Sequence, residues 1–338
     1  MLCLLLALAA GWARAEVIAL NPDVQAEYVV KRGDTLWDIS AYYLQHPWQW
    51  PELWQVNPQI ENPHLIYPGD VLVLTWVNGR PVLGLRQDSL NRRMSPRARR
   101  SPLDDAIPPI PLEAIAAFLQ GPRLVERDEW EAAPYVLAFA DDRLLGSLND
   151  VTYARNLADD SERFWQVLHR GQTILDPETD KVLGYEGIPV GALRLFTFDD
   201  PAEGMLIDVT REVLRGDRLF LEGAPPLPGT FSPAPPEGDI DARIAAIYDE
   251  STQAGQFQIV AINRGSEHGL VPGHVLTLEK KGEKVTDPTK SMFRSVRLPP
   301  LQIGYMMLFN VADKLSYGLI LQATHGVEYG DLARTPRF

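Results

Sequence analysis

"YVVKRGDTLWDIS", residues 28–40, decides the fold of the N-terminal region. Its first residues predict a strand over residues 28–31, and the Gly-Asp pair that follows predicts a tight turn. Thr35 and Asp38 have the spacing of a capping box, in which the two side chains bond the first free amides of a helix. The stretch therefore predicts a strand, a turn and a helix that ends near Leu44.

The residues that follow predict a second helix and a closing strand. Pro51 suits the first turn of that helix, and Asn57-Pro58 ends it. "YPGD", residues 67–70, places Pro second and Gly third, which is the signature of a type II turn. A strand is then expected over residues 71–76, so the predicted order is strand, helix, helix, strand.

Three sequence blocks in this region resemble the lysin-motif (LysM) domain, namely "YVVKRGDTLWDIS", "LWQVNPQI" and "LIYPGDVLVL". The resemblance implies a βααβ fold that binds glycans containing N-acetylglucosamine, in bacteria chiefly peptidoglycan. "QHPWQWPE" between the helices departs from the family, because it is a few residues longer. Asn78-Gly79 predicts a hairpin that adds residues 80–85, so we expect a LysM domain with a hairpin extension over 28–85.

The candidate binding site follows from what a neutral glycan offers to a protein. Hydroxyl and N-acetyl groups are bound by backbone N–H and C=O groups beside a few apolar walls. Gly33 lets the backbone approach a ligand, and the residues after it begin a helix, where unpaired amides are expected to point outward. The resemblance implies that two loops form the groove, with Gly33, Asp34, Thr35 and Leu36 in one and Asn57, Pro58, Gln59 and Ile60 in the other.

Each of these residues alone also has a purely structural explanation. Thr35 can cap a helix, Gly33 can make a turn, and Asn57 can end a helix. The tryptophans allow two interpretations as well, because aromatic rings stack on sugars but also fill the interior of a small domain. We predict that most of them pack in the interior, and we assign none of the following to the glycan: Trp37, Trp48, Trp50, Trp54 and Trp76.

The C-terminal part of the chain contains an internal repeat of strand-like segments. "VGALRLFTFDDPAEGMLIDVTREVLRGDRL" from residue 190 and "IGYMMLFNVADKLSYGLILQATHGVEYGDL" from residue 303 both place Gly-Asp after two alternating strands. We therefore expect two related, barrel-like β domains. "EGAPPLPGTFSPAPPEGD", residues 222–239, holds six prolines and separates them, so few contacts are expected to cross it. One helix is predicted before them, from Pro111 to Gly121.

The predicted fold class is α+β, with a βααβ module followed by two mainly β domains. Before them, the apolar run "MLCLLLALAAGWARA" ends in a small-x-small pattern that predicts signal-peptide cleavage before Glu16, and an uncleaved anchor is the alternative. The predicted division is a signal peptide at 1–15, the LysM domain at 28–85, a linker at 86–111, a first β domain at 112–222, a Pro-rich linker at 223–239 and a second β domain at 240–338.

Charge and composition limit the functions that the chain can have. A net charge of −13 argues against a general nucleic-acid-binding protein. Residues 86–100 run the other way, with six arginines against Asp88, and are either a solvated tether or a foothold on an acidic partner. No run after the signal is long and apolar enough to span a membrane, so we expect an exported, periplasmic protein.

The residue types that usually carry catalysis show no catalytic or metal-binding motif in this sequence. Cys3 is the only cysteine and lies in the predicted signal peptide, and the six histidines show no H-E-x-x-H or other compact metal spacing. His268 and His274 flank a turn and are interpreted as structural. We therefore predict no catalytic residue, no metal and no cofactor. The alternative is a peptidoglycan hydrolase, or an activator of one, that the LysM domain targets to its substrate.

Over its whole length the chain is similar to a family of exported bacterial proteins that join one LysM domain to a β region like that of flagellar assembly factors. "ILDPETDKVLGYE", "VGALRLF" and "HPWQWPELW" carry this longer resemblance. It implies that the protein anchors an outer-membrane secretin ring of type IV pili to peptidoglycan. Copies arranged in a ring would offset the weak binding expected of one short groove. A flagellar or other secretion ring is a further possible partner.

Overall fold

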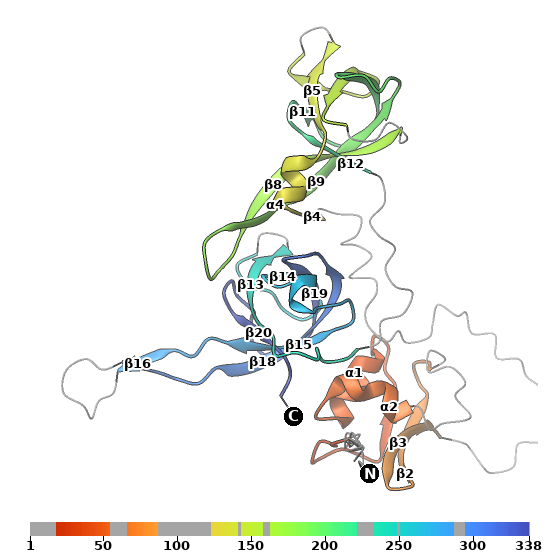
Figure 1. Ribbon diagram of the computed structural model, residues 1–338. Coiled ribbons are helices and arrows are strands. Elements are labelled where there is room, and N and C mark those ends of the chain that lie inside the picture. The colour runs from red at the N-terminus through yellow and green to blue at the C-terminus, as the bar shows by residue number, and fades with distance from the viewer. Residues whose placement is uncertain are drawn as a thin grey trace, which may run out of the picture. The chain divides into compact units, whose positions relative to one another are not determined.

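A computed structural model describes residues 18–54, 66–86, 123–140, 143–157, 163–221, 233–248, 251–286 and 295–337. The chain divides into two compact units, Met1–Pro109 and Ile110–Phe338. A small module with two short helices forms the first unit and β structure dominates the second, so the predicted fold class is confirmed (Figure 1). The predicted signal peptide, residues 87–111 of the predicted linker and the helix expected from Pro111 to Gly121 lie outside the described residues.

The first unit has the predicted order of elements. They are β1 (Glu27–Val29), α1 (Leu36–Tyr43), the 3-10 helix η1 (Pro47–Gln49), α2 (Trp50–Trp54), β2 (Val71–Val77) and β3 (Arg80–Leu85). The strands form one antiparallel sheet in the order β1-β2-β3. Asn78 and Gly79 connect β2 to β3 with φ values of 51° and 79°, as a two-residue hairpin turn requires, so the predicted extension is confirmed.

The interior of the first unit is built from both helices and the sheet. Leu36, Leu53 and Leu72 are fully buried in one cluster that joins α1, α2 and β2. Four tryptophans are also buried, which confirms the prediction that most of them pack in the domain: Trp37, Trp48, Trp50 and Trp54. The longer segment between the helices therefore adds to the interior. Trp76 differs, since it is 64% exposed on β2.

The second unit begins with a barrel that we call barrel 1. Its strands are β5 (Tyr135–Phe139), β7 (Val151–Arg155), β8 (Phe164–Leu175), β9 (Val182–Leu195), β10 (Ala202–Val209) and β12 (Arg218–Leu221). Pairing of β9 with β10 joins the two ends of the sheet, so these six strands form a ring. Shorter elements accompany them, namely β4 (Arg123–Glu126), which pairs with β9, α4 (Arg127–Ala132), β6 (Leu145–Gly146) and β11 (Val213–Leu214).

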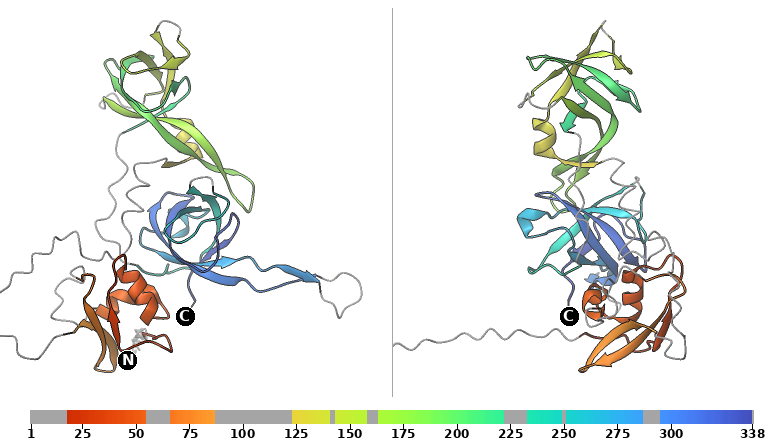
Figure 2. Two further views of the ribbon diagram at one scale, coloured as in Figure 1. Left: turned by 180° about the vertical axis from the view of Figure 1, so that it is seen from behind. Right: turned by 90° about the vertical axis from the view of Figure 1, so that its right-hand side faces the viewer.

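A second closed barrel, barrel 2, follows along the chain. Its strands are β13 (Asp241–Ile247), β14 (Ile259–Ile262), β15 (Val275–Lys280), β18 (Leu301–Val311), β19 (Ser316–Ala323) and β20 (Leu332–Arg334). The 3-10 helix η5 (Ser266–His268) follows β14. Between β15 and β18 the chain continues into a hairpin of β16 (Lys284–Thr286) and β17 (Ser295–Arg297), which projects from the barrel (Figure 2).

The two barrels share one topology, which confirms that the repeated segments are related. Around barrel 1 the neighbours run β5-β7-β10-β9-β8-β12, and around barrel 2 they run β13-β14-β19-β18-β15-β20. Each strand of one ring therefore has an equivalent in the other. In both barrels alternate side chains fill the interior, as Val167 and Leu193 do in barrel 1 and Ile244 and Leu276 in barrel 2.

The expectation that few contacts cross the Pro-rich stretch is wrong, because polar contacts join the barrels. The loop between β8 and β9 reaches barrel 2, where Asn263 donates to Asp176 over 2.7 Å and Arg264 donates to Glu178 over 2.7 Å. Lys314 donates to Asp128 over 2.9 Å. The proline content of residues 222–239 predicts a linker. It does not show that the long strands β8 and β9, which precede this linker, reach the barrel that follows it.

Candidate functional site

The turn after β1 is fixed by the predicted capping box. The Thr35 hydroxyl accepts a hydrogen bond from the Asp38 N–H over 3.1 Å, and the Asp38 carboxylate accepts from the Thr35 N–H over 3.0 Å. The Thr35 hydroxyl also donates to the same carboxylate over 2.7 Å. Thr35 is only 3% exposed, so water does not reach this network readily. The side chain of Thr35 is therefore committed to starting α1.

Asp34 closes the turn from the other side. Its carboxylate accepts from the Lys31 N–H over 2.8 Å and from the Tyr28 hydroxyl over 3.0 Å. Burial and this hydrogen bond to a carboxylate both raise the pKa of Tyr28, which remains protonated. Leu36, the fourth predicted residue of this loop, is fully buried. The side chains of Asp34 and Leu36 thus hold the turn in place.

The predicted outward-pointing amides are wrong for two of these residues. The Asp34 N–H donates to the Lys31 carbonyl over 3.2 Å, and the Thr35 N–H donates to Asp38. The turn and the capping box already use both amides as hydrogen-bond donors. The sequence did not show this, because it indicates only that the two residues follow a glycine. If the predicted site is correct, the part of this loop left to contact a glycan is the main chain around Gly33.

Gly33 is the exposed point of the turn. Its φ of +93° lies in the left-handed region that glycine favours, and a Cβ added there would meet no other atom of the chain within 4 Å. The open space leaves the backbone at Gly33 accessible from solvent. A side chain at this position would fill that space and strain the turn.

A second Gly-Asp turn, Tyr67–Asp70, lies beside the first. The Val30 N–H donates to the Asp70 carbonyl over 2.9 Å, and the Gly69 N–H donates to the Val30 carbonyl over 2.8 Å. Gly69 also has a φ of +93° with open space where a Cβ would stand. The sequence analysis identified this turn from "YPGD" but did not assign it to the site, because no spacing rule shows that the end of β1 pairs with the start of β2.

The same turn recurs in both barrels, at Gly216-Asp217 and Gly330-Asp331. The two glycines have φ values of +91° and +82°, and each aspartate accepts from the N–H three residues earlier, over 2.7 and 2.8 Å. Glycine supplies the left-handed conformation and aspartate satisfies the free amide. Gly-Asp by itself is therefore a structural signal, and Gly33-Asp34 and Gly69-Asp70 differ from the other two turns by lying in the N-terminal module.

The N-terminal module matches a known family. Residues 28–75 match the LysM domain. This match supports binding to peptidoglycan-type glycans, and LysM domains are typical of cell-wall-associated or extracellular proteins. No curated protein matches the chain. Of the eight residues predicted to contact the glycan, Asn57, Pro58, Gln59 and Ile60 lie outside the described residues, so the second wall of the LysM groove stays a prediction.

Barrel 1 brings together a histidine and a carboxylate that the sequence analysis did not connect. His169 Nδ1 lies 2.7 Å from Asp217 Oδ1, although 48 residues separate them in the chain. Asp217 is 4% exposed, and burial raises the pKa of its carboxyl. Because its other oxygen accepts from Leu214, Asp217 ties β8 to the Gly-Asp turn before β12. Among the described residues no group of three or more His, Cys, Asp or Glu side chains is placed to hold a metal.

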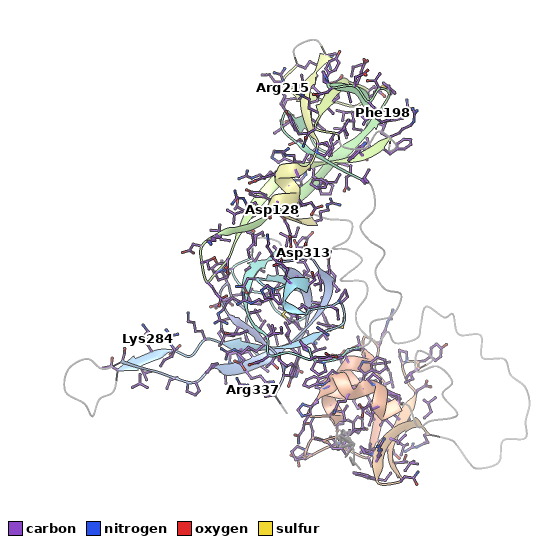
Figure 3. All side chains as sticks on the ribbon, viewed as in Figure 1. Asp128, Phe198, Arg215, Lys284, Asp313 and Arg337 are labelled. Atoms are coloured by element: carbon purple, nitrogen blue, oxygen red, sulfur yellow. The ribbon has the colours of Figure 1, made fainter. Side chains whose placement is uncertain are left out.

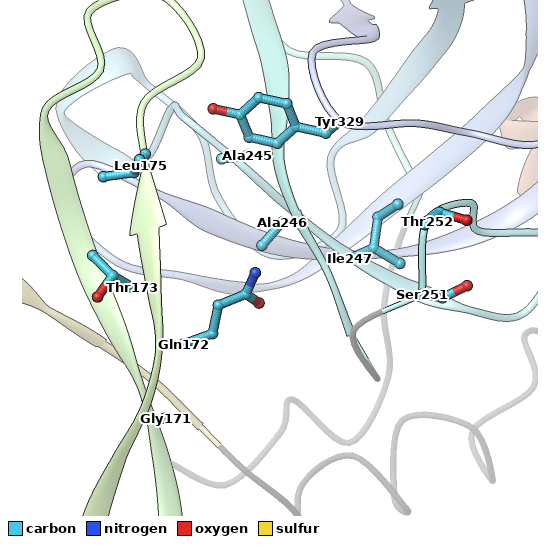
Figure 4. A pocket seen from close by; sticks show the side chains of 10 residues that line it. All are labelled: Gly171, Gln172, Thr173, Leu175, Ala245, Ala246, Ile247, Ser251, Thr252 and Tyr329. Atoms are coloured by element: carbon cyan, nitrogen blue, oxygen red, sulfur yellow. The ribbon is translucent and has the colours of Figure 1, made fainter.

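A pocket of about 770 Å³ lies between β8 and barrel 2 (Figure 4). The β8 side contributes Gln172, and the barrel 2 side contributes Tyr329 and the small side chain of Ala246. A bulge between Arg170 and Thr173 interrupts the pairing of β8 with β9 at this point. The described residues that line the pocket are uncharged, so it offers hydroxyl and amide groups to a neutral molecule but no acid–base pair.

None of the helices in the described ranges has the length and apolar character needed to cross a membrane.

Proposed function

We propose that this protein is a non-catalytic periplasmic anchor that binds peptidoglycan through its LysM domain. The exposed turn at Gly33, with its side chains committed to the fold and open space above its backbone, is the observation that carries the proposal. A neutral sugar needs a backbone that it can approach, and this turn offers one. The two barrels then serve as the part that holds another macromolecule.

A single shallow groove binds weakly, on the order of micromolar to millimolar. A ring of copies that face one polymer compensates, because linking the sites raises the overall affinity by roughly 10²-fold or more. This is why we favour a multimeric partner over a single soluble protein. The resemblance to exported LysM proteins of type IV pili points to the outer-membrane secretin ring, with a flagellar or other secretion ring as the alternative.

Co-sedimentation with purified sacculi tests the glycan-binding part. Gly33→Trp places an indole in the open space above the turn and should abolish binding. Gly79→Trp is the matched control, because Gly79 also has a positive φ of +79° and open space, but lies at the other end of β2. Both variants carry similar backbone strain, so only a loss specific to Gly33→Trp supports the site. Equal binding by the two variants contradicts it.

Two further experiments test the partner and the absence of catalysis. Crosslinking of envelopes followed by purification of the chain should recover a secretin, and recovery of a flagellar ring protein alone would redirect the proposal.

Zymography with the purified chain should give no cleared band. A cleared band would establish a hydrolase, and clearing only after a separate amidase is added would establish an activator.

A further inference from the structure

The pocket between β8 and barrel 2 has walls that belong to different barrels. Gln172 and Thr173 line it from β8, and Ala246, Thr252 and Tyr329 line it from barrel 2 (Figure 4). Its volume of about 770 Å³ lies within the usual range of small-molecule sites, roughly 300–1,000 Å³. A molecule that enters this pocket therefore contacts both barrels.

A β-bulge interrupts each of the two walls. β8 is bulged between Arg170 and Thr173, where it pairs with β9, and β13 is bulged between Ile244 and Ala246, where it pairs with β14. A bulge re-aims side chains and breaks the regular row of backbone groups along a strand. On the β8 side, the side chain of Gln172 points across the pocket toward Ala246 (Figure 4). An extended peptide is a poor occupant, because β8 is irregular here and β13 already has neighbours on both sides in the closed barrel.

Tyr329 stands at one end of the pocket on a firmly held turn. The Glu328 N–H donates to the Asp331 carboxylate over 2.8 Å, and the Gly330 N–H donates to a carbonyl of β13 over 2.8 Å. Lys280 pairs with Glu328 over 3.0 Å and with Asp331 over 3.4 Å. Tyr329 itself remains 53% exposed. A ring that is held in place before binding loses little entropy when a ligand stacks on it.

The other Gly-Asp turns show that the turn itself does not require an aromatic residue. Arg32 and Pro68 precede the two pairs of the first unit, and Arg215 precedes the pair of barrel 1. Arg215 donates to the Arg143 carbonyl over 2.7 Å and lies at the end of barrel 1 away from Asp128 (Figure 3). Tyr329 is therefore a property of the turn beside the pocket.

The polar groups around the pocket are uncharged and available. Within the described part of the chain, the side chains of Gln172, Thr173 and Thr252 make no hydrogen bond. An amide donates and accepts, and so does each hydroxyl. They therefore suit a ligand that carries several hydroxyl groups.

The charges near Tyr329 disfavour an anionic ligand. Burial, followed by the carboxylates of Asp180 and Asp176, raises the pKa of Tyr329, so its hydroxyl stays protonated and donates. Among the described residues that line the pocket there is no lysine or arginine to offset these carboxylates. Asp176 accepts from Asn263 and Thr179, so its oxygens are already in use. A neutral ligand is the best match to this environment.

We propose that this pocket binds a short neutral saccharide, whose apolar ring face lies on Tyr329 and whose hydroxyl groups bond Gln172 and Thr252. A sugar combines an apolar face with a polar edge, and the pocket offers an aromatic ring beside the small Ala246 for the first and amide and hydroxyl groups for the second. β8, β13 and the Tyr329 turn bound the pocket on three sides, so it admits a short oligosaccharide and not a continuous polymer chain (Figure 4). The site is separate from the glycan site proposed at Gly33 and does not depend on it.

Methyl NMR of the full chain labelled at alanine tests the proposal, because Ala246 lies on the pocket wall. Cellotriose and chitotriose, which are neutral, should shift the Ala246 signal in a saturable way, and glucose 6-phosphate should not. Tyr329→Ala should weaken the binding by about threefold to tenfold, and Tyr329→Phe should change it less because the ring remains. Gln172→Ala should weaken it as well. Phe196→Ala is the control, since it removes a ring that is 42% exposed just beyond the other end of β9, and it should leave the affinity unchanged.

Three results would overturn the proposal. The first is an Ala246 signal that does not shift at about 20 mM of either trisaccharide. The second is equal affinity of the natural chain and a Tyr329→Ala chain whose Tm is unchanged. The third is tighter binding of glucose 6-phosphate than of both trisaccharides. Because the Ala246 signal reports on the pocket and sacculus binding is measured separately, each of these results leaves the LysM proposal untouched.

Discussion

Replacing Thr35 by valine removes one hydroxyl from the turn and keeps the shape of the side chain. The variant leaves the Asp38 N–H without its acceptor and the Asp38 carboxylate without a donor at 2.7 Å. An N-cap is worth about 0.5–2 kcal/mol, and the upper half applies to Thr35 because it is 3% exposed and water does not replace the lost contacts. We therefore expect the free energy of unfolding of the LysM domain to fall by about 1–2 kcal/mol.

Thermal unfolding followed by tryptophan fluorescence measures this change. Five of the eight tryptophans lie between residues 37 and 76, so the signal reports mainly on the LysM domain. For a domain of this size each kcal/mol lowers Tm by about 4–8 °C, so Thr35→Val should melt about 5–15 °C below the natural chain. Thr35→Ser is the control, because it keeps the hydroxyl and should lose less than half as much.

The same variant separates a structural role from a binding role. At 25 °C most Thr35→Val molecules remain folded, and the hydroxyl of Thr35 is already used within the turn, so the affinity for chitin oligomers should stay unchanged. An unchanged Tm would refute the capping argument. A folded Thr35→Val chain with lost affinity would show that the hydroxyl itself contacts the glycan, against the contacts described above.

Three further predictions concern the second unit. A hydrogen bond from Arg243 lowers the pKa of Asp241 to about 2, so its contribution to stability is present above about pH 4 and disappears as pH falls toward 2. Urea midpoints against pH should show this loss for the natural chain and a flatter curve for Asp241→Asn. Leu308→Ala leaves a cavity at a fully buried position in barrel 2 and should lower the free energy of unfolding, measured with urea, by about 2–5 kcal/mol. Asn263→Ala removes the contacts to Asp176 and Glu178, so proteolytic cutting of the β8–β9 loop should increase, and because it also removes the acceptor of the Arg243 N–H, the urea midpoint of barrel 2 should fall.

Local signals in the sequence predicted much of the first unit. The spacing of Thr35 and Asp38 predicted a capping box, and Asn78-Gly79 predicted a hairpin, because these features depend on residues at most a few positions apart. The burial of most tryptophans followed from the size of the domain. What the spacing did not reveal is that Asp34 and Thr35 use their own amides, since this depends on the three-dimensional course of the turn.

Contacts between distant segments were the part that local patterns missed. The repeat around the two Gly-Asp turns predicted related barrels, but not that the loop at Asp176 reaches Asn263. The pairing of His169 with Asp217 was missed for the same reason, because only the strand order brings β8 beside β12. The turn at Gly69 lies beside the candidate site because its backbone pairs with that of Val30. Such a pairing between distant residues cannot be predicted from local composition.

An NMR titration of the isotope-labelled chain with chitin oligomers tests the central claim most directly. The account predicts that the amide signals of Arg32 to Leu36 and of the neighbouring Tyr67–Asp70 turn shift in a saturable way. The amide signal of Gly79, at the far end of β2, should not shift. Shifts confined to the Asn78-Gly79 hairpin or to the barrels, with the Gly33 turn unmoved at saturating oligomer, would contradict it.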